Sequence, residues 1–304
     1  MTSNSPIRYS KKLLFTTFNC AKAQLLPLQE MQGTQNDDLI MALTGLAGGI
    51  LNNGSTCGVV IGGAISSAMI RDKELAGQWT LEDEIELLEE IRKDVAWFEN
   101  KFNTCLCRER DELSYQRITV IGLLNPRKVK GCVARTGASM AYFLEKYAGT
   151  GVCRTKSRLT AGEARPCAHC AQTILEEVRE KTGVGNETLT QLSVALDGGI
   201  GLSGGGCGAL AGALMALGLR YAQDPKKTDP KQLRNIYRSM DSVFFNKAKI
   251  LVNRFIKNFG YLECAKLTGK KFRDWNDFSD FRNSSSCDDI NRFLIEETIA
   301  LIQD

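Results

Sequence analysis

Two stretches decide the fold, GGILNNGSTCGVVIGG at residues 48–63 and GGIGLSGGGCGALAGA at residues 198–213. The second repeats the first at an offset of 150 residues. At that constant offset the alignment extends without a gap over residues 20–69 and 170–219, and it keeps most of the glycines and both cysteines of each copy. Chance similarity would not preserve this pattern, so the chain carries an internal duplication.

The cysteines continue the repeat beyond the aligned segment. In the first copy Cys132 follows Cys107 by 25 residues, and in the second Cys287 follows Cys264 by 23 residues. This spacing selects Cys107 rather than Cys105 from the CxC pair. Each copy then has four cysteines in the same order, namely Cys20, Cys57, Cys107 and Cys132, and Cys170, Cys207, Cys264 and Cys287. Three cysteines remain outside the two sets, Cys105, Cys153 and Cys167.

The pattern predicts an all-α protein. Apolar stripes with helical spacing run through residues 80–103 and 230–259. The Ala- and Gly-rich stretches from Cys57 to Arg71 and from Cys207 to Tyr221 predict closely packed helices that begin at their cysteines. Further helices are expected at residues 20–31, 37–51, 170–182 and 187–197, with one strand-like run at 117–124 and a linker at 149–168. We therefore expect two homologous multi-helix domains, residues 1–150 and 151–304, related by a pseudo-two-fold axis.

The composition excludes several kinds of protein. The 304 residues include 39 Lys and Arg against 35 Asp and Glu, and a net charge of +4 is too small to indicate nucleic acid or a membrane surface as the partner. No apolar stretch is long enough to span a membrane, and the first residues lack the apolar core of a secretory signal. We therefore expect a cytoplasmic protein whose thiols stay reduced. A single histidine excludes a His-rich metal site, and the absence of CxxCH excludes c-type haem.

Four cysteines per copy indicate a metal centre. A cysteine at a helix start lies near unpaired N–H groups and the positive end of the helix dipole, so we expect a lowered thiol pKa at Cys57 and Cys207. Four thiolates are the usual ligands of a [2Fe–2S] or [4Fe–4S] cluster and also of structural zinc. Zinc sites normally contain close CxxC pairs, whereas each set here is dispersed over more than 110 residues. The residues therefore favour an iron–sulfur cluster in each copy.

Other interpretations of these residues stay open. Buried cysteines often only fill space, although this explains poorly why four recur in order across a duplication. The glycine-rich turns before Cys57 and Cys207 could bind phosphate at a helix N-terminus, but they match neither GxGxxG nor GxxxxGK[ST]. Cys167 and Cys170 form a CxxC that could cycle as a dithiol, without the βαβ context of such motifs. His169 aligns with Asn19, so we expect a polar residue at a helix start rather than a ligand.

Charge is divided between the copies. Residues 82–99 carry eight acidic side chains against two basic ones, and residues 224–257 carry nine Lys and Arg against three aspartates. Two solvated helix faces of opposite sign are the simplest explanation. The alternative is that these faces guide the docking of a redox partner protein, or of a second subunit in a homodimer.

The two copies resemble a known family. NCAKAQLL at residues 19–26 and HCAQTILEEV at 169–178, together with the two quoted stretches, resemble the redox-active proteins named for their C…GCAxxG…C…C cysteine pattern. CAKLTG at residues 264–269 resembles that family's third-cysteine segment, and Cys287 its fourth cysteine. The second copy matches along nearly its whole length, whereas the first departs after residue 71, since its segment CRERDEL lacks the Leu-Thr-Gly feature.

The resemblance carries an expectation about the cofactor. The family is similar to the domain of split-Soret cytochrome c, a helical protein with a cysteine-lined iron–sulfur site besides its haems. The resemblance therefore implies a helical domain that binds a cluster, with [2Fe–2S] preferred over [4Fe–4S]. Because the haem attachment motif is absent here, the haem function does not carry over.

The sequence predicts an iron–sulfur electron-transfer protein or redox subunit rather than a stand-alone enzyme, with one cluster per repeat. Two rival functions remain. One is a thiol–disulfide oxidoreductase that uses Cys167 and Cys170, and the other is a structural or storage protein that holds zinc on thiolates. No acid–base pair, nucleotide motif or substrate pocket can be argued from these residues.

Overall fold

The computed structural model describes residues 4–109, 126–148, 164 and 166–304. Within these ranges the chain is helical, and extended backbone pairs only at two isolated bridges, Thr56 with Leu106 and Gly206 with Glu263. The predicted all-α class is confirmed. None of the helices described is both long and apolar enough to cross a membrane. The strand-like run 117–124 and most of the linker lie outside the described residues.

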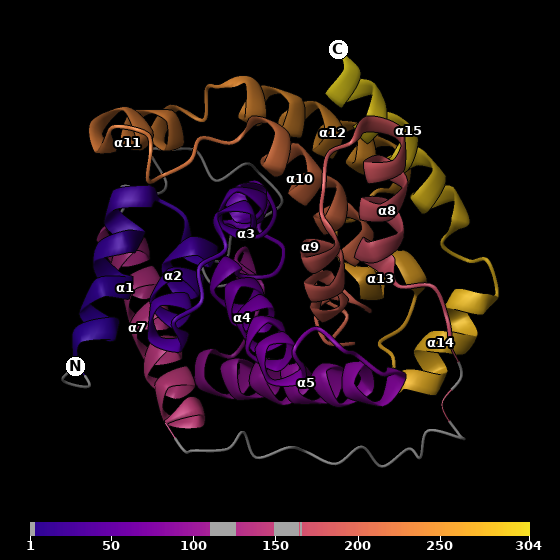
Figure 1. Ribbon diagram of the computed structural model, residues 1–304, viewed down its shortest axis with the longest axis horizontal. Coiled ribbons are helices and arrows are strands. Elements are labelled where there is room, and N and C mark those ends of the chain that lie inside the picture. Colours follow the sequence, from indigo (N-terminus) through magenta and orange to yellow (C-terminus); the bar gives the residue numbers. More distant parts are fainter. Residues whose placement is uncertain (1–3, 110–125, 149–163, 165) are drawn as a thin grey trace.

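The helices of the two repeats correspond along the chain (Figure 1). The first repeat contains α2 (Cys20–Gln32), α3 (Asp37–Ala42), η1 (Leu43–Leu46), α4 (Gly58–Leu75), α5 (Leu81–Phe102) and α7 (Pro126–Tyr147). The second contains α8 (Cys170–Thr182), α9 (Glu187–Leu192), η3 (Ser193–Leu196), α10 (Gly208–Tyr221), α12 (Val243–Phe259) and α15 (Asp288–Gln303). The described residues also form α1 (Asn4–Thr17), α11 (Pro230–Ser239), α13 (Cys264–Thr268) and α14 (Trp275–Asn283).

Most predicted helices form, but two of the expectations are wrong in part. The helix expected over residues 37–51 ends at Leu46, and residues 48–52 then adopt positive φ angles, as residues 198–202 do in the second repeat. The stripe over residues 230–259 is two helices rather than one. Met240 has a φ of 51° and ends α11, after which Ser242 caps α12.

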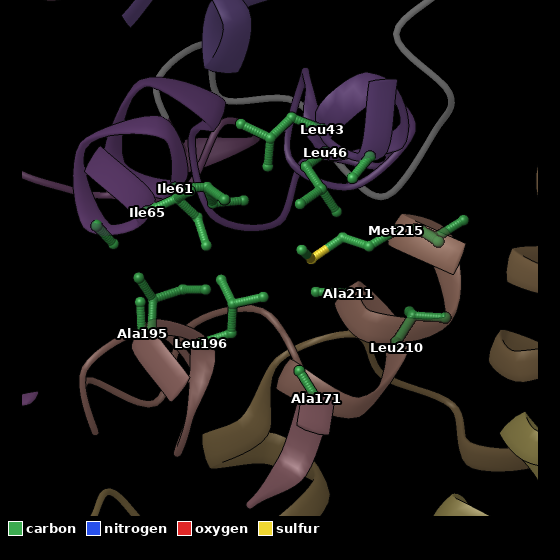
Figure 2. Packing of buried hydrophobic residues seen from close by; sticks show 14 of the residues in the cluster. Leu43, Leu46, Ile61, Ile65, Ala171, Ala195, Leu196, Leu210, Ala211 and Met215 are labelled. Carbon is green, nitrogen blue, oxygen red and sulfur yellow. The ribbon is translucent and has the colours of Figure 1, made fainter. Parts of the chain in front are cut away.

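The two repeats share one hydrophobic core. Helix α10 packs against α3 and η1 of the first repeat, and α4 packs against η3 and α9 of the second. Figure 2 shows the contact between them, where Leu46 lies beside Met215 and Ile61 faces Leu196. Helices α4 and α10, which follow Cys57 and Cys207, are therefore each packed between their own repeat and the other one.

Small residues allow the cysteine-bearing helices to pack closely. A Cβ atom at Gly62 of α4 would lie 2.4 Å from the carbonyl oxygen of Ala21 in α2. At the equivalent Gly212 of α10, it would lie 2.8 Å from the carbonyl oxygen of Ala171 in α8. These close crossings bring the starts of α2 and α4, and of α8 and α10, next to each other.

Candidate metal centre

All four cysteines predicted as ligands in the second repeat stand at helix starts. Cys170 and Cys264 are the first residues of α8 and α13, while Cys207 and Cys287 are the N-caps of α10 and α15. Helices α8, α10 and α15 have 13, 14 and 16 residues, long enough to present the positive end of a helix dipole. The fold therefore delivers these thiols to positions that favour negative charge.

The four thiols interact electrostatically with one another or with a shared neighbour. Cys264 is within electrostatic reach of Cys207 and Cys287, and Cys170 is within reach of Cys264. Arg282 of α14 faces the same group, since its guanidinium hydrogen bonds to Cys287 and interacts with Cys170. All four thiols of the predicted quartet of the second repeat thus interact electrostatically with Arg282.

Backbone N–H groups point at the sulfur atoms. Those of Ala209 and Leu210 donate to the Cys207 thiol, and that of Gly198 donates to the Cys170 thiol. Gly198 begins the run of positive φ angles at residues 198–202, so this left-handed turn aims an amide at the site. N–H···S hydrogen bonds are among the features by which proteins tune cluster potentials.

Burial dominates the ionisation of these thiols. It raises the pKa of Cys207 to about 11, although the N–H groups of the helix start act in the opposite direction. Burial likewise raises the pKa values of Cys170 and Cys264 well above the usual range. The lowered pKa expected for Cys207 is therefore wrong, because desolvation of the thiolate outweighs the helix N-terminus. A bound metal would reverse this balance by replacing the proton.

Cys20 of the first repeat interacts with Cys57 and Cys132. Cys20 begins α2 and forms a hydrogen bond with Cys57, the N-cap of α4, and this bond is the main cause of a raised Cys20 pKa. Cys132 lies within electrostatic reach of Cys20, but it stands inside α7 rather than at a helix start. Gly48 donates its N–H to Cys20, as Gly198 does to its cysteine. The two sites therefore share the amide donor and differ at the fourth cysteine.

Cys107 occupies the backbone position that Cys264 has in the second repeat. The Cys107 N–H donates to the carbonyl of Ser55 at 2.9 Å, and the Cys264 N–H donates to the carbonyl of Gly205 at 2.6 Å. Cys105 lies two residues earlier, where the second repeat has no cysteine. The pairing thus matches Cys107 with Cys264, and the role of Cys107 as a ligand stays a prediction.

His169 lies beside the second cysteine site, and its two ring nitrogens face carboxylates rather than the cysteines. Its Nδ1 is 2.5 Å from Asp197 Oδ2, and its Nε2 is 3.2 Å from Glu84 Oε2 on α5. Burial would lower the His169 pKa, but the two carboxylates together raise it to about 10. Asp197 also accepts the Cys170 N–H at 2.7 Å, so this group fixes the start of α8. The alignment could not reveal the group, because the residue equivalent to Asp197 is Ala47.

Cys105 and Cys167, which lie outside the two quartets, lack the properties of reactive thiols. Burial raises the pKa of Cys167 to about 12 and raises that of Cys105 further. A nucleophilic cysteine requires a lowered pKa, so the CxxC of Cys167 and Cys170 does not have the character of an activated dithiol. Cys153 lies outside the described residues.

The backbone N–H groups of Cys57 and Cys207, at the ends of the glycine-rich turns, are not available to a phosphate. The N–H of Cys57 donates to the carbonyl of Cys105 at 2.7 Å, and the N–H of Cys207 donates to the carbonyl of Leu262 at 2.8 Å. These helix-start donors therefore already have protein acceptors and are not available to an anion.

The donor set fits an iron–sulfur cluster in its chemistry. In the described part of the chain, no three His, Cys, Asp or Glu side chains stand close enough to hold a metal ion as they are placed. All four thiols of the second repeat nevertheless interact electrostatically with Arg282, and backbone N–H groups favour the thiolate form of two of them. Binding would have to draw the thiols closer together, and Cys170, Cys207, Cys264 and Cys287 would be the ligands.

Comparison with known proteins gives the family of the chain. No curated protein and no solved structure matches the sequence. The sequence profile of one family matches twice, over residues 18–146 and again over residues 168–301, in agreement with the duplication. Because these matches together span most of the chain, the protein belongs to the family described as "Putative redox-active protein (C_GCAxxG_C_C)", a description that supports a redox role for its cysteines.

Proposed function

We propose that the protein is an electron-transfer protein that binds one iron–sulfur cluster, of the [2Fe–2S] type, at each cysteine quartet. The observation that carries the proposal is the second site, where four thiols from separate helix starts interact electrostatically with Arg282. Family membership supports the redox character. The first quartet, Cys20, Cys57, Cys107 and Cys132, is proposed as the second binding site on the basis of the duplication.

The residues around the second quartet would each contribute to binding and reduction. A bound cluster supplies the one-electron chemistry. Helix N-termini and the Arg282 guanidinium stabilise the negative charge of the thiolates and of an added electron. The N–H of Gly198 and the helix-start amides beyond Cys207 orient the sulfur atoms. Cys170, Cys207 and Cys264 are at most 8% exposed, which keeps water from these ligands.

The proposal includes the setting in which the protein works. Ten cysteines in the described ranges are free thiols, as expected in a reducing compartment, so we place the protein in the cytoplasm. The electrons would pass to or from a redox partner protein. The thiol–disulfide alternative is disfavoured by the raised pKa values of Cys167 and Cys170.

The test is anaerobic purification followed by visible absorption, EPR, and analysis of iron, zinc and acid-labile sulfide. We expect a coloured protein with iron and sulfide in equal amounts. Cys207→Ser removes one ligand of the second site and should lower the bound iron by at least half. Cys105→Ser is the matched control, since it changes a buried cysteine outside the quartets, and it should leave the iron content unchanged.

Three results would contradict the cluster proposal. A folded, colourless protein without iron would rule out the cluster. Zinc without sulfide would favour the storage or structural alternative. A disulfide between Cys167 and Cys170 that forms and breaks reversibly, in a protein without metal, would favour the oxidoreductase.

A further inference from the structure

The glycine-rich turns before Cys57 and Cys207 contact each other across the boundary between the repeats. The N–H of Gly206 donates to Thr56 Oγ1 at 2.7 Å, and both residues are buried. A Cβ atom at Gly205 would lie only 2.3 Å from the same oxygen. The hydroxyl of Thr56 therefore sits directly against the backbone that leads into the other repeat's cysteine.

A buried ion pair crosses the same boundary. Arg108 Nη1 lies 2.8 Å from Glu263 Oε1, and the two side chains are 7% and 3% exposed. Arg108 follows Cys107 in the chain, and Glu263 precedes Cys264. The ion pair thus joins the third predicted ligand of one repeat to the third of the other.

Backbone pairing connects the hydrogen bond to the ion pair. Gly206 pairs directly with Glu263 in the second repeat. In the first repeat Thr56 pairs with Leu106, two residues before Arg108, and the Arg108 N–H donates to the carbonyl of Gly54 at 2.9 Å. These contacts form one layer, which we call the bridging layer and define by Thr56, Arg108, Gly206 and Glu263. Each of its four members is one peptide bond away from a predicted ligand. A shift of the ligands on one side therefore moves the backbone that carries ligands on the other.

We propose that Thr56 is a positioning residue for both cysteine sites, and that the bridging layer couples them so that filling one raises the metal affinity of the other. The proposal rests on the proposed function in one respect, that the quartets bind metal. Drawing four thiols together must fix the turns that carry them. Because the two sites share the layer, the first metal orders part of what the second requires. Coupling between two sites in a protein is typically about 5- to 150-fold in affinity.

The test is an anaerobic titration of the metal-free, full-length protein with Co²⁺, followed by thiolate-to-cobalt charge-transfer absorption. The wild-type protein should bind two Co²⁺ ions cooperatively. Thr56→Val removes the hydroxyl and keeps the shape, so it should still bind two ions, with the coupling lost and the second ion bound about 5- to 150-fold more weakly. Thr56→Ser keeps the hydroxyl and should titrate like the wild type.

A second pair of variants separates coupling from a general loss of folding. Cys207→Ser disables the second site. At a Co²⁺ concentration that fills half of the sites in the wild type, this variant should bind less than half of the Co²⁺ that the wild type binds. In a Thr56→Val background the same change should remove half, because the first site no longer depends on the second. Glu263→Gln removes the ion pair with Arg108 and so disrupts the bridging layer at a different contact. It replaces Thr56→Val in this experiment if circular dichroism shows that Thr56→Val does not fold.

The outcomes distinguish this inference from the proposed function. Independent binding of two Co²⁺ ions by the wild type, failure to bind Co²⁺, or unchanged cooperativity in Thr56→Val and Glu263→Gln would each overturn the coupling. Iron at both sites together with independent Co²⁺ binding would leave the cluster proposal standing and remove the coupling. Cooperative Co²⁺ binding by a protein purified without iron or sulfide would support the coupling and contradict the cluster proposal.

Discussion

A buried lysine shows how single residues join the two repeats. Lys22 of α2 is fully buried, and its ammonium donates to the hydroxyl of Tyr237 on α11 at 2.5 Å. The same nitrogen lies 5.2 Å from the centre of the Tyr237 ring. No ion pair with an acidic side chain is found for it among the described residues. A buried ammonium with one neutral partner keeps much of its desolvation cost, so this contact orients the repeats at the expense of stability.

The cost of Lys22 can be measured. Lys22→Met keeps the length of the side chain and removes the charge, so we expect the free energy of unfolding to rise by about 1–2 kcal/mol. Tyr237→Phe leaves the ammonium without its acceptor and should lower the free energy of unfolding by about 1–3 kcal/mol. Urea denaturation followed by circular dichroism measures both. Destabilisation by Lys22→Met would show that the lysine has a net favourable role.

At the scale of the elements, the packing of α4 on α2 depends on a missing side chain. A methyl group at Gly62 would approach the carbonyl of Ala21 to 2.4 Å, and the helices would have to move apart. We therefore expect Gly62→Ala to lower the free energy of unfolding by about 1–3 kcal/mol, as overpacked cores do. Gly131 in α7 is the matched control, since a Cβ atom there meets nothing within 4 Å. Gly131→Ala should raise stability by up to about 1 kcal/mol, through helix propensity. Equal effects of the two changes in denaturant titrations would argue against the close crossing.

The helices could be predicted from the sequence where the local residue pattern determines them. Apolar periodicity and the duplication located α2, α4, α8 and α10, and with them Cys20, Cys57, Cys170 and Cys207. The left-handed turns were not predictable, because buried Ile50 and Ile200 adopt positive φ angles that their β-branched side chains disfavour, and only the surrounding packing enforces them. The break between α11 and α12 at Met240 could not be predicted either, because the apolar stripe of residues 230–259 continues through it.

The site was predictable from the sequence only within each repeat. Cysteine order and spacing give the two quartets, whose role as ligands stays a prediction. Arg282 and His169 carry no pattern that marks them, since their positions depend on α14 and on Glu84 of the other repeat. The contact between Thr56 and Gly206 could not be predicted from the sequence either. Aligning the two copies shows how similar they are, but it does not show which of their residues contact each other.

At the scale of the whole molecule, the exchange of packing surfaces between the repeats governs how the protein unfolds. Helix α10 covers α3 and η1, and α4 covers η3 and α9, so either repeat alone would expose the apolar residues seen in Figure 2. Domains with separate cores often unfold in separate steps, whereas two repeats that share a core are expected to unfold together in a single step. Lys22 with Tyr237 and Arg108 with Glu263 reinforce this by placing partners in different repeats.

We therefore expect one cooperative unfolding transition, and the three tryptophans allow it to be observed from both sides. Trp79 and Trp97 belong to the first repeat, and the buried Trp275 belongs to the second. In a Trp79→Phe, Trp97→Phe variant, fluorescence reports the second repeat alone while circular dichroism reports all helices. The two urea midpoints should coincide, because neither core survives loss of the other. A Trp79→Phe, Trp275→Phe variant is the reciprocal control, with Trp97 as the reporter of the first repeat. If fluorescence and circular dichroism separated in either variant, the repeats would be independent folding units, and contacts between them could not couple the two cysteine sites in the way that the bridging layer requires.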